Sequence, residues 1–255
     1  TQLFISLGWQ PPQFAHIPLI HGADGAKMSK RHGALGIDAY RDIGLLPEAM
    51  FNYLLRLGWS HGDDEIISRN RAIEWFDLND VGRSPARFDI DRLTSLNAHY
   101  MREADDGRLI ELIRPILRDR LGVAQLNGEA ERRVAAGLLN LKPRSKNLLE
   151  LVDNSLFYAI DRPLKLDDKA TKLLDSGTRE MLRKLRPALA ELDDWNAKTV
   201  ESTIRAFVTS YDIKLGHVAQ PLRATLTGST VSPSIFEVAS VLGRDETLAR
   251  LDDVT

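Results

Sequence analysis

The stretch GADGAKMSKRHG, from Gly22 to Gly33, determines how the rest of this chain is interpreted. It places three cations within five residues, at Lys27, Lys30 and Arg31, between flanking glycines. Glycine lets the backbone take positive φ values and approach a ligand closely. Lysine carries a compact charge on a long flexible stem, and Ser29 adds a small hydroxyl donor. The stretch therefore predicts a loop that contacts polyphosphate, and the alternative is a solvated basic turn.

The composition indicates a globular protein without an overall nucleic-acid signature. Of the 255 residues, 43% are hydrophobic and 27% are charged, which is enough for packed cores. The net charge is −2, so any contact with nucleic acid has to come from local basic patches. The chain has no cysteine and its six histidines lack metal-ligand spacing, so we expect no zinc. No apolar run approaches the roughly 20 residues that span a bilayer, so we expect no membrane segment.

The first 60 residues predict the end of an α/β unit followed by a helix. A helical start at residues 3–7 ends at Gly8, and residues 14–20 form a short apolar run that predicts a buried strand. One helix and one strand would leave strand edges unpaired, so we expect the chain to begin inside a domain. Pro47 to Leu57 predicts a helix with Gly58 just past its end and an apolar face of Met50, Phe51, Leu54, Leu55 and Leu57.

The remaining sequence is dominated by helical periodicity. A helix is expected over residues 69–76, and Trp59 and Trp75 are expected in a core. From about residue 105, leucine, isoleucine and valine recur at three- and four-residue spacing, which predicts a helical domain. Pro221 is predicted to open a short helix that ends at Gly228. Ser232 is predicted to cap a further helix, with Pro233 in its first position and its end at Gly243. The two helix N-termini would attract phosphates or base acceptors.

Residues 27–31, KMSKR, resemble the KMSKS-type signature of class I aminoacyl-tRNA synthetases, and the flanking sequence extends this match. FAHIP at residues 14–18, LPEA at 46–49 and LGWS at 57–60 resemble bacterial glutamyl-tRNA synthetase, and the likeness continues to the C-terminus. The resemblance implies a mainly α fold. Residues 1–33 would end a Rossmann-type catalytic domain, residues 34–104 would form a connecting domain that contacts the tRNA stem, and residues 105–255 would form an α-helical anticodon-binding domain.

The resemblance also implies the chemistry of the complete enzyme, which joins glutamate to its tRNA through a glutamyl-adenylate with ATP and Mg²⁺. Lys27 and Lys30 would stabilise the charge that moves onto pyrophosphate while the glutamate carboxylate attacks the α-phosphate. Ser29 would help to bind the ATP phosphates. The family's HIGH-type motif is not found in this sequence, so we expect a C-terminal part that cannot aminoacylate alone. A cytoplasmic monomer is the family expectation.

Three basic segments are candidate contacts with the glutamate tRNA. Arg144 is the nearest match to a family arginine that reads the third anticodon base. Arg223, with Ser232, Pro233 and Ile235, resembles the family's C-terminal anticodon-reading surface. Arg87, with Arg83 and Arg92, lies in a segment that touches tRNA in the family. The alternatives are a solvated loop around Arg144, a capped helix with an exposed Arg223, and ordinary exposed or ion-paired arginines.

Other functions stay open at this point. A non-catalytic tRNA-binding module would make the same anticodon contacts without chemistry. Glutaminyl-tRNA synthetase has a β-rich C-terminal region in the family, and the short glutamyl-queuosine enzyme lacks the long C-terminal domain. A purely structural helical scaffold would leave the basic loop and the Arg223 segment unexplained.

Overall fold

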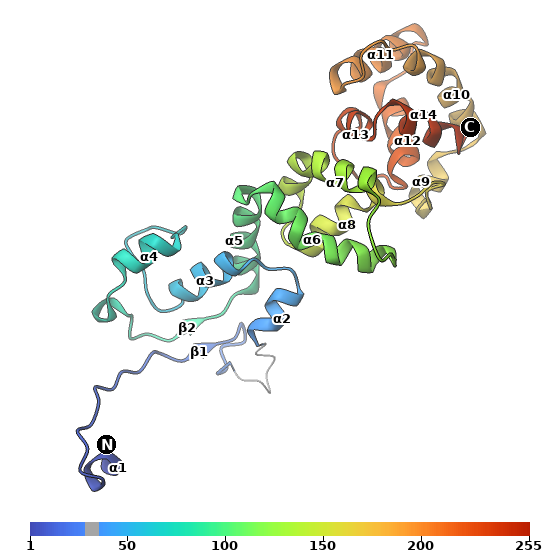
Figure 1. Cartoon of the computed structure of the whole chain (residues 1–255). Helices are drawn as coiled ribbons and strands as arrows, with labels where there is room; N and C mark the ends of the chain where they lie inside the picture. Colours follow the sequence, from blue (N-terminus) through green and yellow to red (C-terminus); the bar gives the residue numbers. More distant parts are fainter. Residues whose placement is uncertain (29–35) are drawn as a thin grey trace. The chain divides into compact units, whose positions relative to one another are not determined.

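The computed structural model describes residues 1–28 and 36–255, which form two compact units, residues 1–97 and residues 98–255 (Figure 1). Ser29 and Lys30, two of the predicted phosphate-binding residues, lie outside the described residues. Within the described part, none of the helices combines the length and the apolar character that crossing a membrane requires.

The first unit begins with the helix α1 (Gln2–Ser6) and an extended segment that leads to the strand β1 (Ile20–His21). β1 pairs in parallel with β2 (Ala86–Arg87). The end of α1 before Gly8 is confirmed, but the predicted buried strand over residues 14–20 is wrong. Phe14 is 60% exposed and Ile17 is 79% exposed. The reason is that a strand needs a neighbour for its backbone hydrogen bonds, and β2 offers only two residues.

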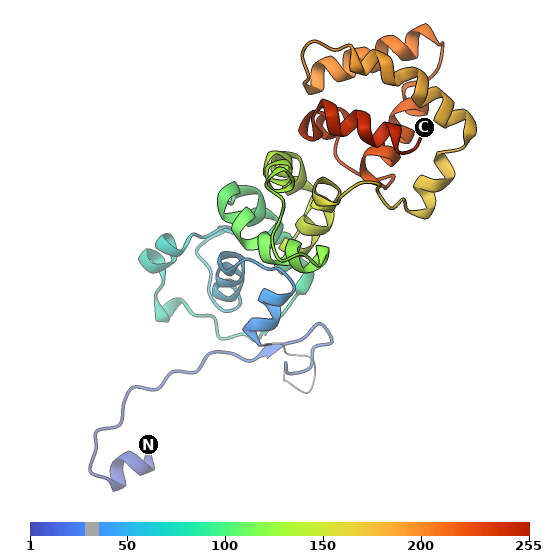
Figure 2. The same ribbon diagram turned by 45° about the vertical axis from the view of Figure 1, so that its right-hand side comes forward.

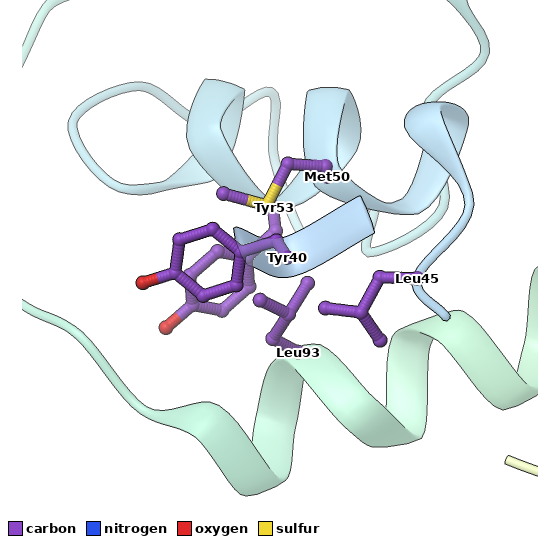
Figure 3. Close-up of a cluster of buried hydrophobic side chains, with 5 residues drawn as sticks. All are labelled: Tyr40, Leu45, Met50, Tyr53 and Leu93. Atoms are coloured by element: carbon purple, nitrogen blue, oxygen red, sulfur yellow. The ribbon is translucent and has the colours of Figure 1, made fainter. Parts of the chain in front are cut away.

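Among residues 36–97, the first unit contains the helices α2 (Ile37–Asp42), α3 (Pro47–Arg56) and α4 (Arg69–Trp75), the first half of α5 (Ile90–Glu103) and the 3₁₀ helix η2 (Leu78–Asp80). The predicted helices starting at residues 47 and 69 are confirmed. Figure 3 shows a core cluster in which side chains from α2, α3, α5 and the loop between α2 and α3 meet: Tyr40, Leu45, Met50, Tyr53 and Leu93. A second small cluster contains Trp59, Ile67 and Ala72, which confirms Trp59 as a core residue.

The predicted apolar face of α3 is partly wrong. Phe51 and Leu54 are 39% and 45% exposed, whereas Asn52 and Tyr53 are buried. Asn52 is buried because its Oδ1 accepts from Ile67 N at 2.5 Å and its Nδ2 donates to the Glu65 carbonyl at 2.9 Å. Buried polar groups are tolerated when they are hydrogen-bonded in this way. Long-range hydrogen bonds of this kind cannot be read from helical periodicity.

The second unit is a helical domain, as predicted (Figures 1 and 2). α6, α7 and α8 pack on one another, and α12 contacts α8, α13 and α14. The helices bury stripes of leucine, isoleucine and valine, and several begin at an Asp or Asn whose side chain accepts from the first turn. After α5 the elements are α6 (Asp106–Leu121), α7 (Gly128–Leu141), η3 (Lys142–Arg144), α8 (Leu148–Ala159), α9 (Asp168–Leu173), α10 (Ser176–Ala190), α11 (Ala197–Ser210), α12 (Leu215–Thr227), α13 (Ile235–Leu242) and α14 (Arg244–Asp252).

Two predicted boundaries near the end of the chain are wrong. α12 begins at Leu215, so Pro221 lies inside this helix rather than opening it. Its neighbours Val218 and Leu222 are fully buried, and this packing outweighs the missing proline N–H. α13 has Ser234 at its N-cap, so Ser232 does not cap it and Pro233 precedes it.

The predicted pair of neighbouring helix N-termini is therefore wrong as well. The segment before α13 instead follows the C-terminal end of α12, which closes at Gly228 with φ +73°. A left-handed residue at this position is the usual helix end, and glycine takes it without a Cβ clash. The predicted end of α13 at Gly243 is confirmed.

Candidate functional site

A pocket of about 280 Å³ lies in the second unit between the α8 region and the loop that follows α12. One wall comes from η3, α8 and the residue after α8: Arg144, Asp153, Asn154, Leu156, Phe157 and Ile160. The other wall comes from the end of α12 and its following loop: Thr227, Ser229, Val231, Ser232 and Pro233. Three residues singled out in the sequence, Arg144, Ser232 and Pro233, are thus brought together across about 90 positions of sequence.

Arg144 is held at the pocket by its backbone. It ends the 3₁₀ helix η3 directly after α7, which confirms that residues 142–146 lie at a helix boundary. The Nδ2 of Asn154 donates to the Arg144 carbonyl at 3.2 Å and to Ser145 Oγ at 3.0 Å. Ser145 Oγ donates in turn to the Leu141 carbonyl at 2.9 Å. These bonds fix where the Arg144 side chain leaves the fold, while the side chain itself stays exposed.

Arg223 reaches the pocket through Ser232. It stands half-buried on α12, and its Nε donates to Ser232 Oγ at 2.9 Å. The Ser232 hydroxyl donates to the Pro233 carbonyl at 2.9 Å. The alternative of an exposed arginine on a capped helix is therefore wrong. Ser232 is used to orient a guanidinium rather than to cap α13.

The two arginines influence each other electrostatically. Burial lowers the pKa of the Arg223 guanidinium, and the positive charge of Arg144 lowers it further. Two cations that repel each other create a local site for an anion or an electron-rich acceptor. Asp153 supplies a carboxylate to the same wall, where its Oδ1 lies 3.4 Å from Arg120 Nη2. The pocket therefore offers both hydrogen-bond donors and an acceptor.

Several pocket residues were missed by sequence reasoning. Asp153 and Asn154 stand on a helix that periodicity assigns to the core, and Thr227, Ser229 and Val231 surround a turn that was predicted only as a helix end. The polar run Asp153, Asn154 and Ser155 in the stretch LLELVDNSLF was the available signal. Val231 is 70% exposed at the pocket, so it is an apolar surface that a ligand can cover.

Ile235 needs a correction, because it is the first residue of α13 and only 2% exposed. Its side chain therefore lies in the core and does not line the pocket. Arg92 also has a partner, since its Nη2 lies 3.0 Å from Glu65 Oε1. That contact favours the reading of Arg92 as an ion-paired arginine.

A second candidate site lies at the basic loop in the first unit. Residues 22–26 form a tight turn in which Gly22 N donates to the Ala26 carbonyl at 2.9 Å and Gly25 has φ +78°. Lys27 follows the turn, forms a backbone bridge with His21 and is exposed. Arg87, opposite His21 in the sheet, has its Nη2 only 3.4 Å from where a Cβ on Gly25 would stand. Lys27 and Arg87 thus flank one glycine turn.

No metal centre accompanies these sites among residues 1–28 and 36–255, where no three metal-ligating side chains are grouped. A tight glycine turn beside two cations suits a phosphate. A half-buried arginine and an exposed arginine beside apolar surface suit an aromatic ring with hydrogen-bond acceptors.

Comparison with protein families gives a match to nearly the whole chain. Residues 108–255 match the anticodon binding domain, and residues 1–95 match the catalytic domain of class I tRNA synthetases (E and Q). Among curated relatives, a glutamate–tRNA ligase of Paramagnetospirillum magneticum is 57% identical over 253 residues, and one of Rhodospirillum centenum is 56% identical over 252 residues. These alignments cover 99% of this chain but 53% and 54% of the relatives, so the chain spans about half their length.

A solved structure gives the same result for the fold. The glutamate–tRNA ligase of Elizabethkingia meningosepticum, crystallised in complex with its amino acid, matches with a TM-score of 0.81 and 26% identity. The match covers 99% of this chain and 53% of that protein.

Proposed function

The chain belongs to the glutamate–tRNA ligase family of class I aminoacyl-tRNA synthetases, and we propose that the pocket of its second unit reads the anticodon of the glutamate tRNA. Two observations carry this proposal: Arg144 lines the pocket, and Arg223 donates to the pocket residue Ser232 and has its pKa lowered by the charge of Arg144. A guanidinium donates to base acceptors in fixed directions and stacks on unpaired bases. Ile160 and Val231 add apolar surface against which a splayed base can lie.

Ser232 and Pro233 complete the proposed reading surface. Ser232 fixes the Arg223 fork, and the Pro233 carbonyl is fixed by Ser232 in turn. Such a chain of hydrogen bonds holds the donor before the RNA arrives, which lowers the entropic cost of binding. Arg144 stays exposed on a fixed backbone, so it can follow a base or phosphate at the pocket mouth.

We propose the division of labour that the resemblance implied. Residues 1–33 end the catalytic domain, residues 34–104 connect it to the tRNA stem, and residues 105–255 form the anticodon-binding domain. The match of residues 1–95 to a catalytic domain supports an enzyme over a non-catalytic tRNA-binding module. We propose a monomer that acts in the cytoplasm.

The whole enzyme is proposed to attach glutamate to its tRNA in an ATP-dependent reaction. The glutamate carboxylate oxygen attacks the α-phosphorus of ATP. The bond between that phosphorus and the oxygen shared with the β-phosphate breaks, and pyrophosphate leaves. Lys27 and Lys30 stabilise the charge that develops on the pyrophosphate, and Ser29 donates a hydrogen bond to the phosphates. Arg87, beside the turn that precedes Lys27, is proposed to contact tRNA phosphate. Mg²⁺ would accompany ATP, and we assign it no ligand in this chain.

The anticodon proposal is tested by binding. The purified chain is titrated with a glutamate tRNA transcript and with a transcript altered only in the anticodon, over a series of salt concentrations. Phosphate contacts weaken with salt for both transcripts equally, whereas base reading appears as a ratio between them. Arg223→Ala and Arg144→Ala are each expected to remove about 1–3 kcal/mol of that discrimination, as for other side chains that read or stack on bases.

The matched control is Arg205→Ala on α11, where the arginine is exposed and paired with Glu201 at 2.7 Å. It should leave the ratio unchanged. A wild-type chain that binds both transcripts equally at every salt concentration would overturn the proposal. The complementary expectation is that the chain alone forms no glutamyl-tRNA, because it spans about half of its relatives. Measurable aminoacylation by the purified chain contradicts that expectation.

A further inference from the structure

A buried arginine lies directly behind the proposed reading pocket. Arg250 of α14 is only 1% exposed, and its Nη1 donates to two main-chain carbonyls, that of Phe157 at 2.8 Å and that of Leu226 at 2.6 Å. Phe157 belongs to the last turn of α8 and lines the pocket. Leu226 belongs to the last turn of α12 and precedes the pocket residue Thr227. One side chain thus joins the helix ends from which both pocket walls arise.

The two carbonyls are groups that a helix alone leaves without partners. The last four carbonyls of an α-helix have no intrahelical donor, and the C-terminal end carries a partial negative charge. A cation placed between two such ends satisfies both and is attracted by both. Because a guanidinium is planar and its donors have fixed directions, it also sets the spacing between the groups it binds.

Arg250 is itself held in place by a carboxylate shared among several cations. Its Nε donates to Glu246 Oε1 at 2.7 Å, one turn earlier on α14. Glu246 Oε2 lies 3.5 Å from Arg133 Nη2 on α7 and 3.8 Å from Arg162 Nε, just after α8. Burial lowers the pKa of Arg250, and the hydrogen bond that Arg250 donates to Glu246 opposes that shift. The network ties α7, α8, α12 and α14 around one point.

We propose that Arg250 is a positioning residue for anticodon recognition, which sets the spacing between the α8 wall and the Ser232 wall of the pocket. The inference rests on the proposed function of that pocket. Arg250 is buried and contacts the carbonyls rather than the ligand, so it acts through the walls. A displacement of one wall relative to the other would move the Arg223 fork away from a base held against Ile160, while phosphate contacts elsewhere on the surface would stay in place.

The test compares Arg250→Lys with Arg186→Lys in the full 255-residue chain. Arg186 also binds α14, through Asp252 Oδ1 at 2.5 Å, but from α10 and on the exposed surface. Arg250→Lys keeps the positive charge but loses the planar guanidinium with its fixed donor directions. We expect its discrimination between the two tRNA transcripts to fall about tenfold, or ~1.4 kcal/mol, with an unchanged salt dependence. Arg186→Lys should keep the wild-type ratio. A folded Arg250→Lys variant that keeps the ratio overturns the inference.

A distance measurement keeps the inference testable if Arg250→Lys does not fold. The chain has no cysteine, so spin labels can be placed through Asp161→Cys, just after α8, and Val231→Cys, in the loop after α12. Both positions are exposed. Glu246→Gln in this background should broaden or shift the distance distribution, and an unchanged distribution overturns the inference. If the wild-type chain shows no anticodon preference, the proposed function fails as well, whereas a preference kept by a folded Arg250→Lys variant defeats only this inference.

Discussion

The two units of this chain close their folds by different devices. In the first unit, Asn52 and Asn97 are fully buried and their amide oxygens accept hydrogen bonds from the main chain of distant segments. In the second unit, helix ends are closed by Gly122 and Gly228 in the left-handed conformation and by the buried Arg250. Left-handed glycines follow helices in both units, since Gly8 follows α1 and Gly44 follows α2. The difference lies in the buried polar side chains: asparagines fix loops in the first unit, and Arg250 fixes helix ends in the second.

The same contrast separates the two candidate sites. Lys27 follows a glycine turn in the first unit and is exposed, which suits a phosphate that moves during a reaction. Arg223 in the second unit is half-buried and bound to Ser232, which suits a base that must be read in one orientation. If this contrast is correct, substitutions at helix ends should damage the second unit and its pocket, and substitutions of buried amides should damage the first.

The largest effect is expected for Gly228→Ala. Gly228 has φ +73°, and a Cβ there would lie 2.7 Å from the Lys165 carbonyl oxygen. Strain and overpacking together should lower the free energy of unfolding by about 2–4 kcal/mol. Gly122 is the matched control, because it ends α6 with φ +66° and open space around it. Gly122→Ala should cost about 1 kcal/mol, measured for both variants by denaturant unfolding. Equal losses of unfolding free energy in the two variants would show that backbone strain alone sets the cost at both helix ends.

A smaller and differently placed effect is expected for Asn52→Ala. The substitution leaves Ile67 N and the Glu65 carbonyl without their side-chain partner, which should cost about 1–3 kcal/mol. Hydrogen exchange read by mass spectrometry should show faster exchange in residues 37–97 and wild-type exchange in residues 106–255. Asn79→Ala, at an exposed asparagine of η2, is the control and should stay within about 0.5 kcal/mol of wild type. Faster exchange throughout the chain would contradict the separate closure of the two units.

These two variants also mark how far sequence reasoning reaches. Gly228 was predicted as a helix end because glycine at such a position has a local cause. Asn52 was not predicted as a core residue, because its partners lie 13 and 15 positions away. The helices of the second unit were predictable from apolar periodicity, yet the start of α12 was missed since packing around Pro221 outweighed its local signal.

The residues of the candidate pocket also fall into those that the sequence identified and those that only the fold shows. Arg144, Arg223, Ser232 and Pro233 were identified through resemblance, whereas their convergence required the fold. Asp153 and Asn154 carry no local signature of a site, and only the fold shows that they line the pocket. Arg250 has no signal in the sequence at all, because its role depends on two carbonyls that belong to other helices. Local chemistry is therefore readable from sequence, and long-range polar contacts are not.

The smallest expected effect is on the stability of the folded chain at acid pH. The carboxyls with lowered pKa values are Glu129, Asp167, Asp175 and Asp252, and all four lie in the second unit. Asp175 caps α10, where the hydrogen bond from Thr178 N, at 2.8 Å, holds the pKa of its carboxyl below the ordinary value. A group whose pKa is lower in the folded than in the unfolded chain stabilises the fold above the unfolded pKa. That contribution is lost as the pH falls through the folded pKa, hence below about pH 4.

Asp175→Asn should therefore flatten the pH dependence of stability in the second unit, because asparagine still caps a helix but does not titrate. The measurement is the free energy of unfolding at neutral pH and at the lowest pH at which the chain stays folded. Hydrogen exchange in residues 106–255 then locates the change. Asp77→Asn is the control: Asp77 accepts from Asn79 N at 2.8 Å at the start of η2 in the first unit. It should leave the acid dependence of the second unit unchanged. If Asp175→Asn keeps the wild-type slope, the charge of this cap does not stabilise the second unit, and the neutral hydrogen bond alone closes that helix end.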